Sequence, residues 1–149
     1  MRIYFDCCCL NRPYDDLSDN IVRMEAEAVL SIIDICESDK WLSFGSDVLF
    51  DEILGITNID KRNKVILLYR SAKQYIDLTD DIIYRAKQLE RYNIKSYDAL
   101  HVASAESVGA DVLLTTDKDF INAARRSDAK VPTKNPLVWL AEVLYDTKS

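Results

Sequence analysis

The first candidate for chemistry is Asp6, a carboxylate that directly follows a predicted strand. The run Arg2-Ile3-Tyr4-Phe5 is rich in β-branched and aromatic side chains, which predicts a short buried strand. Ligands in an open α/β sheet collect at the carboxyl ends of the strands, so an acid at this position is a candidate site residue. The structural alternative is that Asp6 only ends the strand by accepting backbone hydrogen bonds in a turn.

Other acids stand at comparable positions. Residues 111–115 form a second apolar run that predicts a strand, and Asp117 and Asp119 follow it. Glu52 lies at the border of the buried face of a helix predicted over residues 47–56. Its carboxylate is therefore directed either to solvent or to a site.

Asp98 lies in the first turn of a helix predicted over residues 96–109. The helix dipole alone explains an acid there, since the charge complements the dipole by roughly 0.3–1 kcal/mol. His101, the single histidine, is predicted to be a packed or hydrogen-bonded residue rather than a metal ligand. The consecutive cysteines Cys7, Cys8 and Cys9 suit neither a disulfide framework nor a zinc site, and we expect reduced, structural thiols.

As a set, these acids suit a hard divalent cation. The four candidate catalytic and metal-binding residues are Asp6, Glu52, Asp98 and Asp117. Mg²⁺ and Mn²⁺ prefer oxygen ligands, and Mg²⁺ usually keeps several waters while a few carboxylates and substrate phosphates hold it. Clustered carboxylates raise one another's pKa, so such a site needs a cation or protons. The sequence has no Walker-type glycine loop, nucleophile elbow or His-rich zinc motif.

The elements that position these acids alternate between strand and helix. This alternation predicts an α/β protein: a single domain, residues 1–149, with three α/β/α layers around a mostly parallel central sheet. The predicted helices cover residues 18–38, 47–56, 60–73, 79–92, 96–109 and 120–126, and a C-terminal helix has Asn135 at its cap and Pro136 at its first position. Further strands are predicted over residues 41–45 and 75–78 and near Val131.

Some local features are predicted in more detail. Residues 7–17 are expected to be irregular. Ser18, Ser46 and Ser96 are expected to cap helices, and Thr79 is expected to open one. The buried face of the helix over residues 18–38 is predicted to contain Ile21, Met24, Val29, Ile32, Ile33 and Cys36, and its exposed face Glu25, Glu27, Asp34 and Glu37.

Length and charge limit the function further. A chain of 149 residues is long enough for an independent core, and its N-terminus is not that of a signal peptide, so we expect a cytoplasmic protein without membrane segments. The net charge of −6 argues against broad adhesion to nucleic acid. Residues 1–60 carry four basic and thirteen acidic residues, a net −9, whereas residues 61–149 carry fifteen and twelve, a net +3. A basic strip beside an acidic site is compatible with this asymmetry.

Three blocks of sequence resemble the PIN-domain ribonucleases, whose bacterial members include VapC-type toxins. The blocks are Ile3-Tyr4-Phe5-Asp6 with the following Cys8-Cys9-Leu10-Asn11-Arg12-Pro13, then Ser46-Asp47-Val48-Leu49-Phe50-Asp51-Glu52, and then Tyr97-Asp98-Ala99-Leu100-His101-Val102-Ala103 with Leu114-Thr115-Thr116-Asp117-Lys118-Asp119-Phe120. The blocks span nearly the whole chain in the order that the family uses. The third block, which combines residues 97–103 with residues 114–120, is the most specific. The loop over residues 7–13 is more elaborate than the opening common among the toxins.

The resemblance implies roles for individual residues. Asp6, Glu52, Asp98 and Asp117 match the acidic quartet that binds Mg²⁺ or Mn²⁺ in the family, and Asp119 and Asn11 match accessory positions. The implied activity is metal-assisted hydrolysis of single-stranded or looped RNA, as the toxin of a toxin–antitoxin pair. The resemblance also implies a small antitoxin partner and a homodimer.

Two other functions remain open from the sequence. One is a catalytically inactive PIN-like module that binds RNA or serves as a scaffold, although a module without metal would gain by losing clustered charge. The other is a phosphohydrolase of a different α/β type, which lacks support because no Asp-x-Asp pair follows the first strand.

Overall fold

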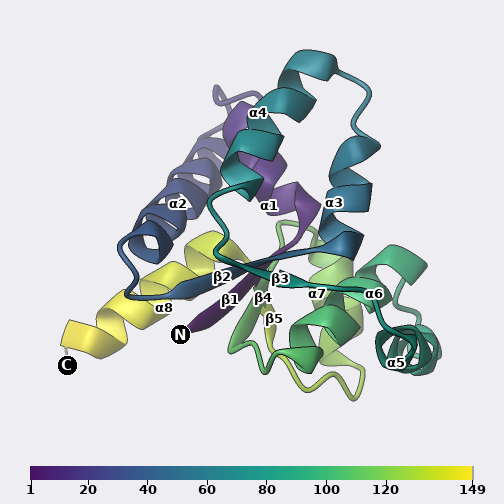
Figure 1. The fold of residues 1–149 in the computed structure, drawn as a ribbon. Coiled ribbons are helices and arrows are strands. Elements are labelled where there is room, and N and C mark those ends of the chain that lie inside the picture. The colour runs from purple at the N-terminus through teal and green to yellow at the C-terminus, as the bar shows by residue number, and fades with distance from the viewer. Residues whose placement is uncertain (149) are drawn as a thin grey trace.

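A computed structural model of the chain describes residues 1–148. Its centre is a five-stranded sheet in the order β3-β2-β1-β4-β5, and every neighbouring pair of strands is parallel. The strands are β1 (Arg2–Phe5), β2 (Leu42–Ser46), β3 (Gln74–Ile76), β4 (Val112–Leu114) and β5 (Thr133–Lys134). The sheet is flanked by helices, and the predicted fold class is confirmed (Figure 1).

The helices connect the strands in chain order. They are α1 (Cys7–Asn11), the 3₁₀ helix η1 (Arg12–Tyr14), α2 (Asn20–Glu37), α3 (Asp47–Leu54), α4 (Ile59–Tyr69), α5 (Asp80–Glu90), α6 (Ser96–Ser107), α7 (Lys118–Arg125) and α8 (Pro136–Lys148). No helix in the described part of the chain has the length and apolar character needed to cross a membrane.

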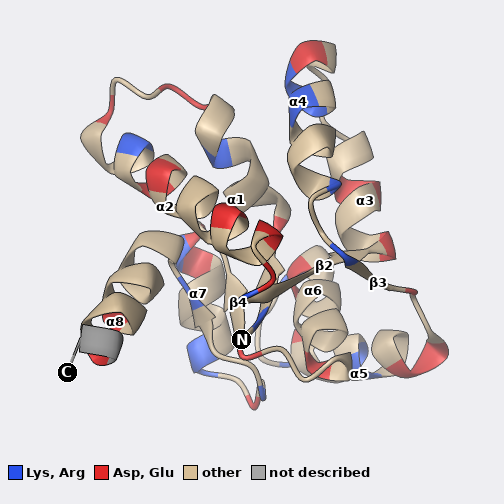
Figure 2. Ribbon diagram, turned by 60° about the vertical axis from the view of Figure 1, so that its left-hand side comes forward, with Lys and Arg blue, Asp and Glu red and all other residues tan. Residues whose placement is uncertain are grey.

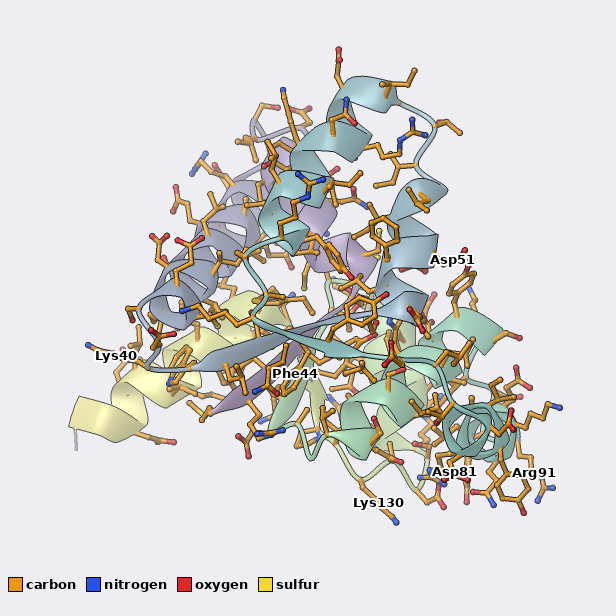
Figure 3. The ribbon with its side chains drawn as sticks, viewed as in Figure 1. Lys40, Phe44, Asp51, Asp81, Arg91 and Lys130 are labelled. Atoms are coloured by element: carbon orange, nitrogen blue, oxygen red, sulfur yellow. The ribbon has the colours of Figure 1, made fainter. Side chains whose placement is uncertain are left out.

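Two apolar clusters fill the spaces on either side of the sheet. Ile3 and Phe5 of β1 face a cluster with side chains of α1, α2, α3, α4 and α8. Tyr4, between them in sequence, faces the opposite cluster with side chains of α5, α6 and α7. Successive side chains of a strand point to opposite faces of the sheet, so β1 contributes to both clusters. A parallel sheet between two helical layers is buried on both faces in this way. In Figure 3, Phe44 of β2 lies in the sheet layer.

Several helix starts agree with the sequence. Ser46 caps α3 by accepting a hydrogen bond from the backbone N–H of Leu49, and Thr79 caps α5 through Ile82. The Asn135 side chain accepts from two backbone N–H groups at the start of α8, which begins at Pro136 as predicted.

Other local predictions are wrong. Residues 7–14 are not irregular but form α1 and η1, because the Asp6 side chain caps α1 by accepting from Cys9 N–H at 3.1 Å. Asp19 rather than Ser18 caps α2, and the residue before α6 is Lys95, whose side chain makes no cap hydrogen bond.

The buried face of α2 also differs from the prediction. Ile21 and Met24 are 58% and 43% exposed, whereas Glu25 is buried. Glu25 is accommodated because its carboxylate lies 3.1 Å from Arg12 Nε and accepts a hydrogen bond from Asn135. Helix α4 ends at Tyr69 rather than near residue 73, and the last strand lies at Thr133–Lys134, after the buried Val131.

Candidate active site

The parallel sheet brings the starts of several connections to one edge. Asp6 directly follows β1, α3 with Glu52 directly follows β2, and Asp117 comes three residues after the end of β4. Helix α6 precedes β4, so it runs back across the sheet, and Asp98 in its first turn lies toward the same carboxyl edge. This is the edge at which open α/β sheets bind ligands.

Asp6 is the most deeply buried of these acids, with 2% of its surface exposed. Burial raises the pKa of its carboxyl from the ordinary 3.8 to about 6, and the charge of Glu52 adds to the increase. Nearby His101 and hydrogen bonds from Thr115 and Cys9 act in the opposite direction. Asp6 therefore caps α1, as the structural alternative predicts, and it is also a buried carboxylate whose ionisation is costly; its role as a site residue stays a prediction.

Asp98 and Asp117 form a second pair of interacting acids. Burial raises the pKa of Asp98 to about 6, with further increases from the charges of Asp117 and Glu52. Asp117 also caps α7, since its Oδ1 accepts hydrogen bonds from the backbone N–H groups of Asp119 and Phe120. Asp98, Asp117 and Asp119 line one small cavity of about 40 Å³.

Glu52 is held by a hydrogen-bond network that enters the core. His101 Nε2 lies 3.1 Å from Glu52 Oε1, and His101 Nδ1 lies 2.7 Å from the hydroxyl of Tyr4. The Tyr4 hydroxyl is in turn 2.8 Å from Ser46 Oγ, which caps α3. Tyr4, Ser46 and His101 are fully buried, whereas the Glu52 side chain is 30% exposed. The network thus fixes one end of a carboxylate whose other end reaches solvent.

These interactions link all four predicted ligands. Glu52 acts on the pKa of both Asp6 and Asp98, Asp117 acts on that of Asp98, and His101 lowers the pKa of both aspartates. Within the described residues, no group of three or more His, Cys, Asp or Glu side chains is arranged to hold a metal ion. The donors nevertheless fit Mg²⁺ or Mn²⁺ chemically, since Mg²⁺ is usually bound by one or two carboxylates and completes its shell with waters and phosphate oxygens.

Lys95 is the cation next to this cluster. It lines the small cavity with Asp98 and Asp117, and its charge lowers the pKa of Asp98. Other basic residues in the strip expected from the sequence are paired elsewhere: Lys61 with Asp15, Lys73 with Asp39, and Arg85 with Glu106 and Asp128. Figure 2 shows acidic residues on α3 and both basic and acidic residues on α4.

A larger groove opens beside Glu52. It has a volume of about 410 Å³, and Glu52 and Asn11 line it together with residues of α1, α3 and α6. Asn11, predicted as an accessory residue, is half-buried and donates from Nδ2 to Cys7 Sγ at 3.5 Å. The predicted site residues are therefore distributed around one region: Asp98, Asp117 and Asp119 line the cavity, Glu52 and Asn11 line the groove, and Asp6 is buried.

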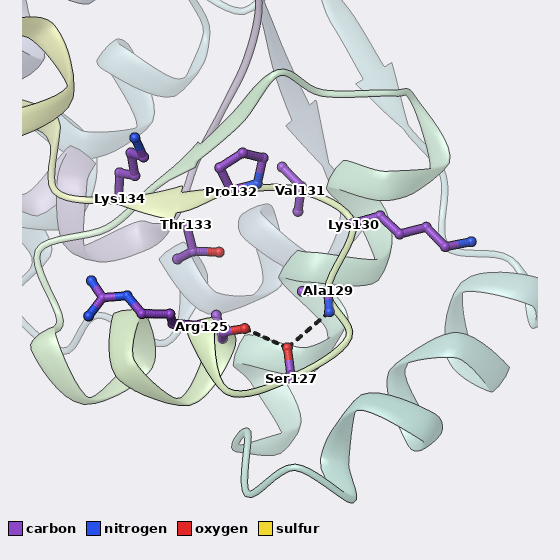
Figure 4. A pocket seen from close by; sticks show the side chains of 9 residues that line it. Arg125, Ser127, Ala129, Lys130, Val131, Pro132, Thr133 and Lys134 are labelled. Atoms are coloured by element: carbon purple, nitrogen blue, oxygen red, sulfur yellow. Dashed lines mark hydrogen bonds between the residues drawn. The ribbon is translucent and has the colours of Figure 1, made fainter. Parts of the chain in front are cut away.

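A separate pocket of about 310 Å³ lies between the end of α7 and β5 (Figure 4). Arg125, Lys130, Thr133 and Lys134 are among the residues that line it, and none of the predicted site residues does. Lys134 is paired with Glu142 at 3.0 Å. This pocket belongs to the loop between the last helix of one layer and the edge strand, not to the acidic site.

Four residues around the acids were not among the predicted site residues: Tyr4, Lys95, His101 and Thr115. His101 was correctly predicted to be a hydrogen-bonded residue, but its partner Glu52 was not predicted. For Lys95 and Thr115 a signal does exist, because each lies within three residues of a candidate acid. Tyr4 also lies two residues before Asp6, but as part of an apolar strand it is predicted only to be buried.

A parallel α/β/α sandwich with acids at the carboxyl edge of its sheet belongs to the class of open α/β folds, which bind their ligands at that edge. Residues 17–126 match the sequence model of the PIN domain. This match covers more than half of the chain, and the protein belongs to the PIN domain family. PIN domains are generally nucleases that use divalent metals. No curated protein matches the chain with significant sequence similarity.

Solved structures support the fold. The chain is similar to VapBC2 from Rickettsia felis bound to a DNA fragment from their promoter, with a TM-score of 0.60 and 14% identity, over 91% of this chain and 98% of the other. It is also similar to PAE2754 from Pyrobaculum aerophilum, with a TM-score of 0.54 and 19% identity, over 95% and 90% of the two chains. At these identities the likeness concerns the arrangement of the elements.

Proposed function

We propose that this protein is a Mg²⁺- or Mn²⁺-dependent endoribonuclease that hydrolyses single-stranded or looped RNA. The observation that carries the proposal is the mutual interaction of the carboxylates, in which Glu52 raises the pKa of both Asp6 and Asp98. Interacting acids at the edge of the sheet are costly unless a cation or protons neutralise them. Membership of the PIN domain family supports the same activity.

Each residue has a role in this proposal. Asp6, Glu52, Asp98 and Asp117 would hold the cation, which when bound supplies Lewis-acid stabilisation of charge at the phosphate. His101 orients Glu52 through the contact at its Nε2. Lys95 lies where its ammonium group can bind a phosphate oxygen of the RNA beside Asp98. Asp119 and Asn11 border the site as accessory polar residues.

The test is cleavage of single-stranded RNA by the purified protein. We expect cleavage in Mg²⁺ or Mn²⁺, loss of cleavage with a chelator, and a loss of more than about 100-fold in Asp6→Asn, because even residues that only support metal ligands contribute 10–100-fold. Asp77→Asn is the matched control: Asp77 directly follows β3 as Asp6 follows β1, but it is exposed. Cleavage that survives chelation, or full activity in Asp6→Asn, would contradict the proposal.

We further propose that the protein acts in the cytoplasm as the toxin of a toxin–antitoxin pair, bound by a small antitoxin protein and paired as a homodimer. Exposed apolar side chains support an interaction surface on α2 and α4: Ile21, Met24, Ile59 and Leu67 are between 43% and 65% exposed. Light scattering of the purified protein would give twice the 17.1 kDa chain mass if the homodimer forms. A monomer at micromolar concentration would contradict that part of the proposal.

The alternative is a catalytically inactive PIN-like module that binds RNA or serves as a scaffold. The same assay separates the two functions, because a binding module would retain RNA under metal and chelator alike without cleaving it. The presence of all four acids favours the nuclease, since a metal-free module would be more stable without them.

A further inference from the structure

The groove beside Glu52 has features of a binding site that the acids alone do not explain. It lies between α1, α3 and α6, and Cys8, Asn11, Asp51, Glu52, Ile56 and Tyr97 are among the residues that line it. Its volume of about 410 Å³ is in the range of small-molecule sites. Because Glu52 belongs both to the groove and to the acidic cluster, a ligand in the groove is adjacent to the site of the proposed cleavage.

Tyr97 provides an aromatic surface at this groove. It is 40% exposed, and its hydroxyl donates a hydrogen bond to Asp51, which Figure 3 labels on α3. The Tyr97 ring also lies 6.4 Å from the ring of His101, at an angle of 36°. Contacts to α3 and to the buried His101 thus hold the ring in place while part of it stays open. Exposed aromatic rings on which bases stack are a common feature of single-strand binding.

The polar groups of the groove are mostly hydrogen-bond acceptors. Asn11 offers neither of its amide groups to a ligand, since Nδ2 donates to Cys7 Sγ and Oδ1 is buried. Asp51 and Glu52 add carboxylates, which repel a phosphate. A ligand that fits must therefore be neutral and must donate hydrogen bonds. Nucleobases with an exocyclic amino group meet both conditions.

We propose that this groove binds the base of a nucleotide next to the cleaved phosphate, and that it selects adenine, guanine or cytosine over uracil. Tyr97 stacks on the base, and the exposed Asp51 carboxylate accepts a hydrogen bond from the exocyclic amino group. Uracil has a carbonyl oxygen in place of that amino group. This oxygen cannot donate a hydrogen bond, and the acceptor oxygens of the groove repel it. The inference rests on the proposed ribonuclease activity and narrows its substrates.

The first experiment compares single-stranded poly(A), poly(C) and poly(U) as substrates in Mn²⁺. We expect kcat/KM for poly(A) and poly(C) to exceed that for poly(U) by about tenfold or more. Leaving one polar group at a base without a hydrogen-bond partner weakens binding by about that factor. Asp51→Ala should reduce this ratio because kcat/KM falls mainly for poly(A) and poly(C). Equal cleavage of the three polymers by the wild-type protein would overturn the inference and leave the ribonuclease activity intact.

The second experiment tests Tyr97 with variants that separate stacking from folding. Tyr97→Ala should raise KM on poly(A) about tenfold with a smaller change in kcat, since the loss of one stacked base corresponds to roughly that factor. Tyr97→Trp retains an aromatic surface and should retain most of the affinity. Tyr84→Ala, at a tyrosine of α5 that is 66% exposed, is the control and should leave KM unchanged. A wild-type KM in Tyr97→Ala would overturn the stacking role.

Binding without metal distinguishes failure of the inference from failure of the proposed function. Fluorescence anisotropy of labelled A₆ and U₆ with chelator present measures recognition without cleavage. Tighter binding of A₆ that depends on Tyr97 supports the groove as a base site even if no RNA is cleaved. Equal binding of A₆ and U₆ contradicts it, whether or not the protein is a nuclease.

Discussion

The imidazole Nε2 of His101 lies 3.1 Å from Oε1 of Glu52, although 49 residues separate the two in sequence. This contact connects α6 to α3 and joins the acidic edge of the sheet to the buried hydroxyl of Tyr4. The Glu52 carboxylate, whose side chain is 30% exposed, is therefore oriented from the core rather than from the surface. Orientation of this kind matters for the proposed cation site, because partners behind metal ligands usually fix their geometry.

The first prediction concerns the buried hydroxyl of Tyr4. Tyr4→Phe removes an oxygen that hydrogen-bonds both His101 and Ser46, so each loses a partner inside the core. We expect the free energy of unfolding in urea to fall by about 1–3 kcal/mol. Tyr84→Phe, at an exposed position, is the control and should change stability by less than about 0.5 kcal/mol. Equal unfolding midpoints for the two variants would show that the network contributes nothing to stability.

The second prediction concerns pH. The pKa of Asp6 is about 6 in the folded protein, above its ordinary 3.8, so between about pH 4 and pH 6 the folded state binds more protons than the unfolded state. This carboxyl therefore makes the metal-free protein less stable as pH rises through that window, by about 3 kcal/mol at roughly 1.4 kcal/mol per pKa unit.

The Asp6→Asn variant isolates this contribution. With a chelator present, we expect it to be more stable than the wild type at pH 7 and equally stable near pH 4, because an amide keeps an oxygen for the Cys9 N–H but carries no charge. Thermal unfolding of both proteins across this pH range gives the difference directly. A difference that does not change with pH would rule out a raised pKa at Asp6.

The third prediction concerns metal binding by Asp98. Mg²⁺ or Mn²⁺ should raise the melting temperature of the wild type, because a ligand that binds only the folded state stabilises it by mass action. In Asp98→Asn this shift should be much smaller, while the metal-free variant is no less stable since repulsion by Asp117 and Glu52 is relieved.

Asp81→Asn is the matched control for Asp98→Asn. Asp81 is also an acid in the first turn of a helix, α5, but it lies among a different set of residues. We expect its variant to show the wild-type metal shift in calorimetry. If Asp98→Asn and Asp81→Asn respond to metal alike, Asp98 serves only the helix dipole.

The fourth prediction concerns Lys95. Lys95 lines the cavity of Asp98 and Asp117, and its charge lowers the pKa of Asp98. Lys95→Gln should therefore weaken RNA binding several-fold and lower the slope of log K against log salt concentration by about one. Lys87→Gln, at an exposed lysine of α5, is the control and should bind RNA as the wild type does. Binding is measured by titration at several salt concentrations in the inactive Asp6→Asn background. Identical salt slopes for all three proteins would exclude a phosphate contact by Lys95.

The sequence alone determined the alternation of strands and helices, the parallel sheet and the caps at Ser46, Thr79 and Asn135. These features depend on local patterns: apolar runs of strand length, helical spacing of apolar residues and a side chain that can accept hydrogen bonds at a helix start. The same patterns located Asp6, Asp98 and Asp117 at element ends and Glu52 at the border of a buried helix face, because these positions are themselves local. Their assignment as metal ligands stays a prediction.

The tertiary structure alone decided how these residues interact. Local pattern placed Glu25 on the outside of α2, but Arg12 and Asn135, from distant parts of the chain, pair with it and make its burial possible. Likewise, nothing along the sequence pairs Glu52 with His101 or Asp6 with Thr115. Burial and pairing of polar groups depend on what the fold brings opposite them, since a buried charge is tolerated only where a partner compensates for lost water.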